Sequence, residues 1–268
     1  MNTQIPSAMV LPLYQIDAFT SQLFKGNPAA VIPLTEWIDA ELMQNIAMEN
    51  NLSDTAFFVP NSNGFEIRWF TPEMEINLCG HASLATAYYL YQIAGYNKED
   101  ILFESPAGPL QVSRKQDMYL LNFPRWKPER YNENTDDILE AVALKNIAGV
   151  YKYRDLIIEA ETEKDIIQCT PDFTALKKTG KKVIITAPGS SADFVSRFFA
   201  PVAGIDEDPV TGSAHSQIIP FWSEKLGKNR MQAKQLSKRG GDLYCEDLGN
   251  RVIIGGQCAF FMKGEITI

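Results

Sequence analysis

The strongest constraint on the fold of this 268-residue chain is a pattern that occurs twice in the same order. Arg68-Trp-Phe-Thr-Pro72 matches Arg197-Phe-Phe-Ala-Pro201 at an offset of 129 residues. Gly80-His-Ala82 then matches Gly212-Ser-Ala214 at an offset of 132 residues. We interpret the two ordered matches as an internal duplication, which predicts two similar domains, each with a core of its own.

The segment after the first glycine motif is apolar on almost every face. His81–Ala94 is dense in Ala and Leu and stops at Gly95, a pattern that is typical of a helix buried on all sides. Strand-like runs such as Phe65–Phe70 and Met118–Asn122 flank it. The sequence therefore predicts an α/β (α+β) fold with two pseudo-symmetric domains, each a mixed β-sheet or barrel wrapped around one central helix.

A polar stretch separates the two halves. Pro124–Thr135 is rich in Pro, Asn and charged residues, which is typical of a boundary between domains. We expect an N-terminal domain over residues 1–123, completed by a C-terminal strand at 258–268, and a C-terminal domain over residues 124–257. Asp136–Asn146, just after the boundary, is predicted to be a helix.

The charge balance limits the partners of the protein. Its 25 Lys and Arg residues against 33 Asp and Glu residues give a formal charge of −8, which argues against nucleic acid as a ligand. No apolar run approaches the roughly 18 residues of a membrane-spanning helix, so we expect no membrane partner. Met1–Met9 is polar and contains no Lys or Arg, unlike the start of a secretion signal. We therefore expect a cytoplasmic protein.

The sequence carries no motif for a metal or a cofactor. The cysteines form no C-x-x-C pair, which favours neither a disulfide framework nor a structural zinc site; they are Cys79, Cys169, Cys245 and Cys258. The motifs typical of nicotinamide, nucleotide and catalytic zinc sites are also missing. We therefore expect chemistry that needs no cofactor.

Both histidines of the protein lie in the two glycine motifs, LCGHAS and DPVTGSAHS. Each motif begins a predicted helix, and a helix N-terminus carries unpaired N–H groups and about half a unit of positive charge. Two such ends facing one cleft would bind a small anion such as a carboxylate; the positions concerned are Gly80, Ala82, Gly212 and Ala214. The alternative is that the glycines only form turns. We favour the shared anion site, and a small carboxylate-bearing metabolite as its ligand.

Four strings in the sequence resemble one protein family. They are DAFTSQLFKGNPAAV, MQNIAMENNLSDTAFF, IRWFTPEMEINLCGHASLATA and DPVTGSAH, and the resemblance runs from about residue 13 to the end. These strings are similar to those of the phenazine-biosynthesis PhzF-like proteins, which are related in fold to diaminopimelate epimerase. The resemblance implies two pseudo-symmetric domains, an active site in the cleft between them, and a homodimer.

The resemblance also implies a set of site residues. The proton-transferring glutamate of the family falls on Glu49, at the end of a helix that apolar spacing predicts over Ala40–Glu49. The further residues that the resemblance places around the substrate are His81, Asp208 and Ser213, to which we add Asn27 as a substrate-binding residue. By itself, Glu49 would be taken for a solvated helix end, the usual position of a glutamate. His215 has no clear counterpart and is expected to be structural.

The epimerase relatives use two cysteines, one at each glycine motif, to move a proton across a carbon atom. Here Cys79 lies at the first position but Thr211 lies at the second, so a two-thiol mechanism lacks one of its acid–base groups. We therefore expect a cofactor-independent isomerase in which Glu49 moves a proton within the substrate, and we keep Cys79 as a further candidate. Two alternatives stay open: a binding protein without catalysis, and a hydrolase that uses Cys79 and His81.

Overall fold

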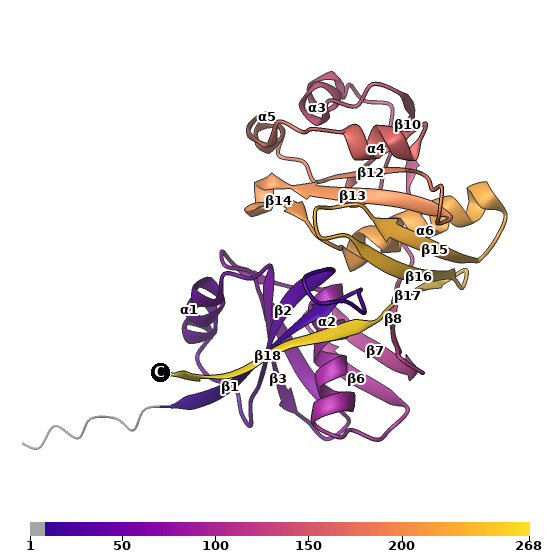
Figure 1. The fold of residues 1–268 in the computed structure, drawn as a ribbon. Helices are drawn as coiled ribbons and strands as arrows, with labels where there is room; N and C mark the ends of the chain where they lie inside the picture. The colour runs from indigo at the N-terminus through magenta and orange to yellow at the C-terminus, as the bar shows by residue number, and fades with distance from the viewer. Residues whose placement is uncertain (1–8) are drawn as a thin grey trace, which may run out of the picture.

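The computed structural model describes residues 9–268, in which strands dominate and six α-helices are present (Figure 1). Most of the polar start Met1–Met9 lies outside the described residues. Within residues 9–268, no helix is both long and apolar enough to span a membrane. The predicted mixed α/β class is confirmed.

The first half of the chain forms a continuous run of paired strands. Its elements are β1 (Val10–Ala18), β2 (Asn27–Pro33), α1 (Ala40–Asn50), β3 (Asp54–Pro60), β4 (Phe65–Phe70), β5 (Glu75–Ile76), α2 (Gly80–Tyr88), the π-helix η1 (Tyr89–Ile93), β6 (Asp100–Ser105), β7 (Gly108–Lys115) and β8 (Met118–Pro124). β2 runs parallel to β3, and β3 runs antiparallel to β4. β4 pairs antiparallel with β5 and parallel with β6, from which β7 and β8 continue antiparallel.

The second half contains the same order of pairings. Its elements are β9 (Glu129–Arg130), α3 (Asp136–Val142), β10 (Ile147–Lys152), β11 (Leu156–Ala160), α4 (Glu163–Gln168), α5 (Phe173–Lys178), β12 (Val183–Pro188), β13 (Phe194–Ala200), the 3₁₀-helix η2 (Pro201–Ala203), β14 (Ile205–Asp208), α6 (Gly212–Leu226), β15 (Arg230–Gln235), β16 (Gly241–Asp247), β17 (Arg251–Gly256) and β18 (Cys258–Thr267). β11 runs parallel to β12, and β12 antiparallel to β13. β13 pairs antiparallel with β14 and parallel with β15, and β16 and β17 follow antiparallel.

An ion pair occurs at the same place in both runs. Arg68 on β4 binds Glu75 on β5 through two hydrogen bonds of 2.7 Å. Arg197 on β13 binds Glu207 on β14 in the same way, at 2.7 and 3.0 Å. Because a bidentate pair fixes direction as well as charge, the arginine of each repeated motif orients the short strand that leads to a glycine helix.

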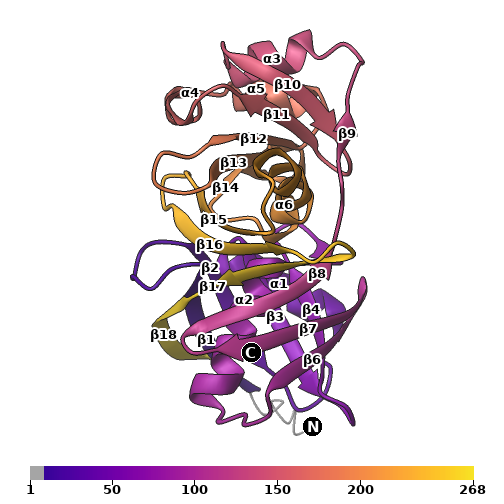
Figure 2. The same cartoon turned by 90° about the vertical axis from the view of Figure 1, so that its right-hand side faces the viewer.

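A buried helix follows each glycine motif. The residues of α2 from Gly80 to Ala87 are all buried, and α6 is buried over most of its length. The prediction of burial on all sides over His81–Ala94 is wrong in its last residues, since Gln92–Ala94 is exposed. Figure 2 shows α2 among the strands of the first half and α6 among those of the second. α2 continues into the π-helix η1, which begins at Tyr89. The ring of Tyr89 contacts Tyr14 and Phe58 at centroid distances of 4.6 and 5.8 Å.

One predicted helix is shorter than expected. The prediction of a helix over Asp136–Asn146 is wrong in its last residues, since α3 ends at Val142. Ala143 adopts a left-handed φ of 57°, which stops the helix, and β10 begins at Ile147. The apolar residue Leu144, which extended the helical pattern, is buried from a loop instead.

Two strand pairings join the halves of the chain. β8 pairs antiparallel with β17, from Tyr119 opposite Gly256 to Pro124 opposite Arg251. The last strand, β18, returns to the first half and pairs antiparallel with β1 along its length. Figure 1 shows yellow β18 beside indigo β1 in the lower group of elements, and the second half above them. The halves therefore lie against each other near the starts of α2 and α6.

Candidate active site

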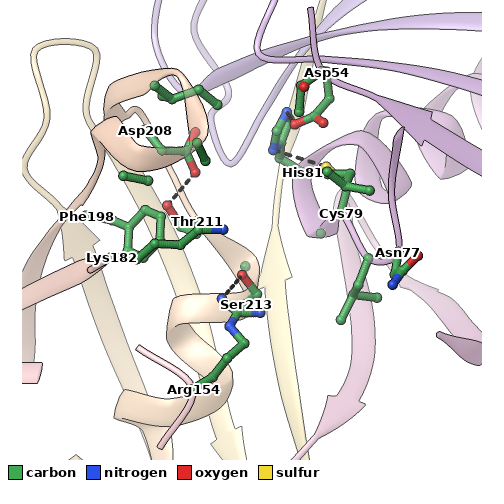
Figure 3. Close-up of a pocket in the computed structure, with 18 of the residues that line it drawn as sticks. Asp54, Asn77, Cys79, His81, Arg154, Lys182, Phe198, Asp208, Thr211 and Ser213 are labelled. Carbon is green, nitrogen blue, oxygen red and sulfur yellow. Dashed lines mark hydrogen bonds and ion pairs between the residues drawn. The ribbon is translucent and has the colours of Figure 1, made fainter. Parts of the chain in front are cut away.

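A cleft of about 530 Å³ lies where the two glycine helices begin (Figure 3). Gly80 at the start of α2 and Gly212 at the start of α6 both line it. A Cβ atom on Gly80 would lie only 3.0 Å from the Cα of Gly212, so the two helix ends touch. Glycine at both positions permits this approach, because any side chain would push the two backbones apart. Each half of the chain therefore contributes one wall of the cleft.

The helix ends direct positive partial charge at the cleft. The residues before the helices, Cys79 and Thr211, are extended, with φ of −134° and −115°, and neither side chain caps its helix. The first turn of each helix therefore keeps backbone N–H groups that the residue before it does not satisfy, and the helix dipoles add to their charge. Such an arrangement favours a small anion.

The carboxyl group beside the start of α2 belongs to Asp54, the first residue of β3. Its side chain is 7% exposed, and its Oδ2 lies 3.4 Å from Nε2 of His81. Its Oδ1 has no hydrogen-bond partner among residues 9–268. Burial and the charge of Asp208 raise the pKa of Asp54 well above its usual value, against a smaller lowering by the Cys79 thiol. A buried carboxyl group with a raised pKa and an unpartnered oxygen is suited to accept and return a proton.

His81 lies among three polar groups. Its Nδ1 is 3.2 Å from the amide nitrogen of Asn27 and 3.5 Å from the sulfur of Cys79, while Nε2 faces Asp54. Burial lowers the pKa of His81 to about 3, so the ring is neutral around neutral pH. A neutral ring that accepts from Asn27 at Nδ1 carries its proton on Nε2, on the side of Asp54.

Asp208, at the end of β14, lies across the cleft from Asp54 (Figure 3). Both of its oxygens are occupied: Oδ1 accepts from Asn27 at 2.7 Å, and Oδ2 accepts from the hydroxyl of Thr211. Burial raises the pKa of Asp208 to about 6, and these two hydrogen bonds oppose the rise. Asp208 is therefore held in place by donors, whereas Asp54 keeps one oxygen for another partner.

Asn27 connects the two halves behind the cleft. Its amide nitrogen contacts Asp208, the carbonyl oxygen of Val210 at 2.9 Å, and His81, and its oxygen accepts from Ser53 at 3.0 Å. Asn27 is completely buried and does not line the cleft. The expectation that Asn27 contacts substrate is therefore not supported by its place in the structure. Its contacts give it a positioning role for His81 and Asp208, which lie 54 and 181 residues away in sequence.

The structure does not bring Glu49 to the cleft. The predicted helix α1 is confirmed over Ala40–Asn50, but its buried stripe consists of Met43, Ile46 and Ala47. Glu49 lies off this stripe, is exposed, and does not line the cleft. The assignment of proton transfer to Glu49 therefore needs correction, because the helix directs that side chain to solvent.

Asp54 is the functional candidate that the sequence reasoning missed. It follows α1 by a few residues, after Asn51 ends the helix with a left-handed φ of 49°. The signal that could have found it is local: Asp54 heads the run Thr55–Val59, which is apolar enough to be buried on both faces. A carboxylate at the start of a fully buried strand is costly, and it suggests a specific use.

Other residues of the glycine motifs belong to the core. Ala82 and Ala214 are at most 1% exposed and do not line the cleft, unlike the glycines beside them. His215 is fully buried, its Nδ1 donates to the carbonyl oxygen of Thr211 at 2.8 Å, and its ring packs on Phe194. Burial lowers the pKa of His215 to about 4. These contacts agree with a structural role for His215.

The outer part of the cleft carries positive charge. Arg154, Lys182 and Ser213 line it. Arg154 donates a hydrogen bond of 2.9 Å to Oγ of Ser213, and its guanidinium carbon lies 5.0 Å from the ring centroid of Trp126. Lys182 lies close enough to Asp208 to lower the pKa of that group slightly, although burial outweighs the effect. An anionic group in the cleft would therefore meet both cations.

Asp54, Cys79 and His81 form a group whose potential metal-ligand atoms all lie within 4.8 Å of one another. Cys79 faces Nδ1 of the ring and Asp54 faces Nε2, whereas an imidazole binds an ion through one nitrogen, so the group fits proton transfer better than metal binding. Burial, together with the charge of Asp54, raises the pKa of Cys79 well above its usual value. The thiol is therefore protonated, which weighs against a hydrolase that uses Cys79 as nucleophile.

Comparison with known sequences finds relatives over the whole chain. A family model described as PhzC-PhzF, phenazine biosynthesis-like protein, matches residues 16–264. Two Pseudomonas aeruginosa proteins named uncharacterized isomerases are each 43% identical over 261 residues, which cover 97% of this chain and 100% of the relative. Phenazine biosynthesis-like domain-containing protein 2 of Mus musculus is 37% identical, with the same coverage.

Solved structures with a similar fold agree with the family match. The crystal structure of a phenazine biosynthesis PhzF family protein from Enterococcus faecalis has a TM-score of 0.93 at 47% identity, over 97% of this chain and 100% of that chain. A hydroxyproline epimerase from Agrobacterium vitis has a TM-score of 0.64 at 9% identity, over 97% of this chain and 93% of that chain, which shows a common fold and no more. On the family match and these identities, the chain belongs to the PhzC-PhzF family of phenazine biosynthesis-like proteins.

Proposed function

We propose that this protein is an isomerase that moves a proton within a small carboxylate-bearing substrate, and that Asp54 is the proton-transferring group. The observation that carries the proposal is that Asp54 lines the cleft and that its buried Oδ1 has no hydrogen-bond partner among residues 9–268. Relatives that are named isomerases support the reaction class. The proposal keeps the one-carboxylate chemistry expected from the sequence and replaces Glu49 by Asp54.

The proposed reaction is a shift of a proton along an unsaturated substrate. Asp54, as a carboxylate, takes a proton from a carbon beside a double bond; the C–H bond breaks and its electron pair moves into the substrate. Asp54 then returns the proton to the far carbon of the original double bond, so a new C–H bond forms and the double bond moves by one position. One acid–base group on one face of the substrate is sufficient, and no oxidant or reductant is consumed.

The charge that develops on the substrate would be stabilised by the rest of the cleft. The N-terminal ends of α2 and α6 and the side chains of Arg154 and Lys182 supply positive charge to the cleft. The neutral ring of His81, whose Nε2 lies 3.4 Å from Oδ2 of Asp54, can direct its N–H toward the carboxylate and so favour the form that takes up the proton. Thr211, at the place of the second epimerase cysteine, donates to Asp208 and serves as a support for that carboxylate.

Proton exchange with solvent tests the proposal. The wild-type protein is incubated in D₂O with a panel of small unsaturated carboxylates, and deuterium uptake and isomer formation are followed by mass spectrometry and chromatography. Asp54→Asn should lower the rate by on the order of 10²–10⁴ because it keeps the shape of the side chain but cannot carry the proton. Glu49→Gln is the matched control and should keep the wild-type rate.

Two outcomes would contradict the assignment: full activity in Asp54→Asn, or an equal loss in Glu49→Gln. If the wild type binds a carboxylate tightly but neither exchanges its protons nor isomerises it, the protein is a binding protein of the same fold, which is the alternative left open by the sequence.

We also propose that residues 1–123 with 258–268, and residues 124–257, are two domains that arose by internal duplication, with the substrate held between them. The repeated order of strand pairings and the two equivalent Arg–Glu pairs support this. An experimental structure in which residues 60–122 and 190–256 did not superpose, with α2 on α6, would overturn it.

A further inference from the structure

A second cavity, of about 360 Å³, adjoins the cleft on the side of the second half. Its polar lining includes Tyr131, Lys152, Arg154, Asp155, Lys181 and Lys182, and we call it the lysine pocket. Arg154 and Lys182 also line the cleft, so the two cavities share a boundary made of two cations.

The lysine pocket collects three lysines that no acidic side chain balances, beside Arg154, which pairs with Asp155. Within residues 9–268, none of Lys152, Lys181 and Lys182 takes part in an ion pair. The protein as a whole is acidic, with a formal charge of −8, so such a concentration of cations is not a consequence of composition. Cations gathered around one cavity repel one another, and an anion in the cavity would relieve that repulsion.

The acidic residues at or near the lysine pocket already form hydrogen bonds to side chains other than the three lysines. Asp155, the one carboxylate that lines it, is 4% exposed, and its Oδ2 accepts from Arg154 at 2.6 Å and from Gln217 at 2.7 Å. Glu133 accepts a hydrogen bond from Tyr131 and does not line the pocket. The lysines therefore remain available to a ligand.

Contacts with neighbouring side chains hold two of the cations, Lys152 and Arg154, at the wall of the lysine pocket. The Lys152 ammonium lies 5.2 Å from the ring centroid of Tyr131, which holds it at the wall by a cation–π contact. Arg154 is fixed by Asp155, by Ser213 and by the face of Trp126, and it stands between the two cavities. A ligand that reached from the cleft into the lysine pocket would pass this arginine.

We propose that the lysine pocket binds a second anionic group of the substrate, distant from the carbon atoms that exchange the proton. This deepens the proposed isomerase function and rests on it: the substrate class becomes small molecules with two anionic groups, either two carboxylates or a carboxylate and a phosphate. The carboxyl group in the cleft would meet the helix ends, and the second group would meet Lys152, Lys181 and Lys182.

Binding of model anions tests the proposal without a known substrate. Straight-chain dicarboxylates from succinate to suberate are titrated into the full-length protein at low salt, each beside the monocarboxylate of the same chain length. At the best length the dicarboxylate should bind on the order of ten-fold more tightly, since two or three partly exposed ion pairs together contribute about this much. The ratio of the dicarboxylate affinity to the monocarboxylate affinity should fall at high salt, because salt screens such ion pairs.

Variants then test whether the lysines of the lysine pocket cause the tighter binding of the dicarboxylate. The double variant Lys152→Gln/Lys181→Gln should bring the ratio of the two affinities close to one, and this ratio is insensitive to a general loss of folded protein. Lys98→Gln, which removes an exposed lysine of the first half, is the matched control and should keep the wild-type ratio. A phosphonate-ended carboxylate of the same length, measured in parallel, tells which second group the pocket prefers.

Three results would overturn the proposal: a ratio near one for every length in the wild type, a ratio that survives in the double variant, or inorganic phosphate that binds beside the dicarboxylate without competing. None of these results would contradict the proton-transfer proposal, which the Asp54→Asn and Glu49→Gln variants test in the D₂O experiment. Conversely, an active Asp54→Asn variant would leave the anion-binding result standing.

Discussion

The Cα of Gly212 lies 3.0 Å from the position that a Cβ on Gly80 would occupy, so two helices from opposite halves of the chain meet backbone to backbone at the floor of the cleft. The reverse distance, from a Cβ on Gly212 to the Cα of Gly80, is 3.1 Å. Both positions also face the ring of Phe123. The contact brings the positive ends of two helix dipoles to one place, a repulsive arrangement that an anion in the cleft would relieve.

Gly212→Ala should therefore destabilise the protein although alanine favours helices. The new methyl group would press on the Gly80 backbone, and over-packing of this kind costs about 1–3 kcal/mol, against a gain of up to about 1 kcal/mol in helix propensity. Urea denaturation measures the difference. Gly264→Ala, where a Cβ would meet no atom within 4 Å, is the control and should leave the free energy of unfolding nearly unchanged. Equal stability of the two variants would mean that the helix ends separate freely.

Cys79→Ala should keep isomerase activity. The Cys79 thiol is buried, and its pKa is raised well above the usual value by burial and by the charge of Asp54, so it is a neutral neighbour of His81. The D₂O assay measures the rate of the variant beside that of Asp54→Asn. A folded Cys79→Ala protein that is as inactive as Asp54→Asn would return the chemistry to the thiol.

Asp208→Asn should change how stability depends on pH. The pKa of Asp208 rises from 3.8 in the unfolded chain to about 6 in the folded protein, so the folded protein binds this proton more tightly. Its contribution to stability is present below the unfolded value and is lost as the pH rises through the folded value. The free energy of unfolding of the variant, relative to wild type, should therefore rise by about 3 kcal/mol as the pH increases from well below the unfolded pKa value to well above the folded one.

His215→Gln should give the opposite slope. The pKa of His215 falls from 6.5 to about 4 on folding, so its contribution is present above the unfolded value and is lost as the pH falls through the folded value. Relative to wild type, this variant should become more stable as the pH is lowered. Denaturation curves of both variants over the same pH series check the signs, and slopes of the same sign would contradict the environments described for the two groups.

We propose that the chain self-associates, as the family resemblance implies, through an apolar surface formed by β18 and the loop after β1. This surface consists of exposed side chains, Phe24, Phe260, Phe261 and Met262, which are 67%, 40%, 42% and 41% exposed. Patches of this kind are typical of contacts between copies of a chain. Light scattering should give twice 30.0 kDa for wild type and 30.0 kDa for Phe261→Glu. Leu102→Glu, at an exposed leucine of β6, is the control, and a monomeric wild type would contradict the expectation.

Several features of this protein could be predicted from the sequence because they depend on nearby residues. The all-round apolarity of His81–Ala94 predicts a buried helix, and α2 is buried from Gly80 to Ala87, although Gln92–Ala94 is exposed. The spacing of Met43, Ile46 and Ala47 predicts α1, because a helix of this period brings those side chains to one face. The two glycine motifs likewise indicate that two helix starts share one site.

The choice of the acid–base group depended on tertiary structure. Glu49 and Asp54 are five positions apart in the sequence, and both carry a carboxyl group. One turns to solvent at the end of α1, and the other is enclosed by His81 and Cys79 from the start of α2 and by Asp208 from the second half. The pKa of a carboxyl group is set by this desolvation and by charges from distant parts of the chain, which no local pattern records.

The pairing of the halves decided the rest of the site in the same way. The sequence predicts the two buried helices, strands that flank them and the glycines at which the helices begin. That Asn27 bridges His81 and Asp208, and that Arg154 and Lys182 line both cavities, follows from the folded structure alone. These side chains lie far apart in the sequence, and packing sets the distances between them.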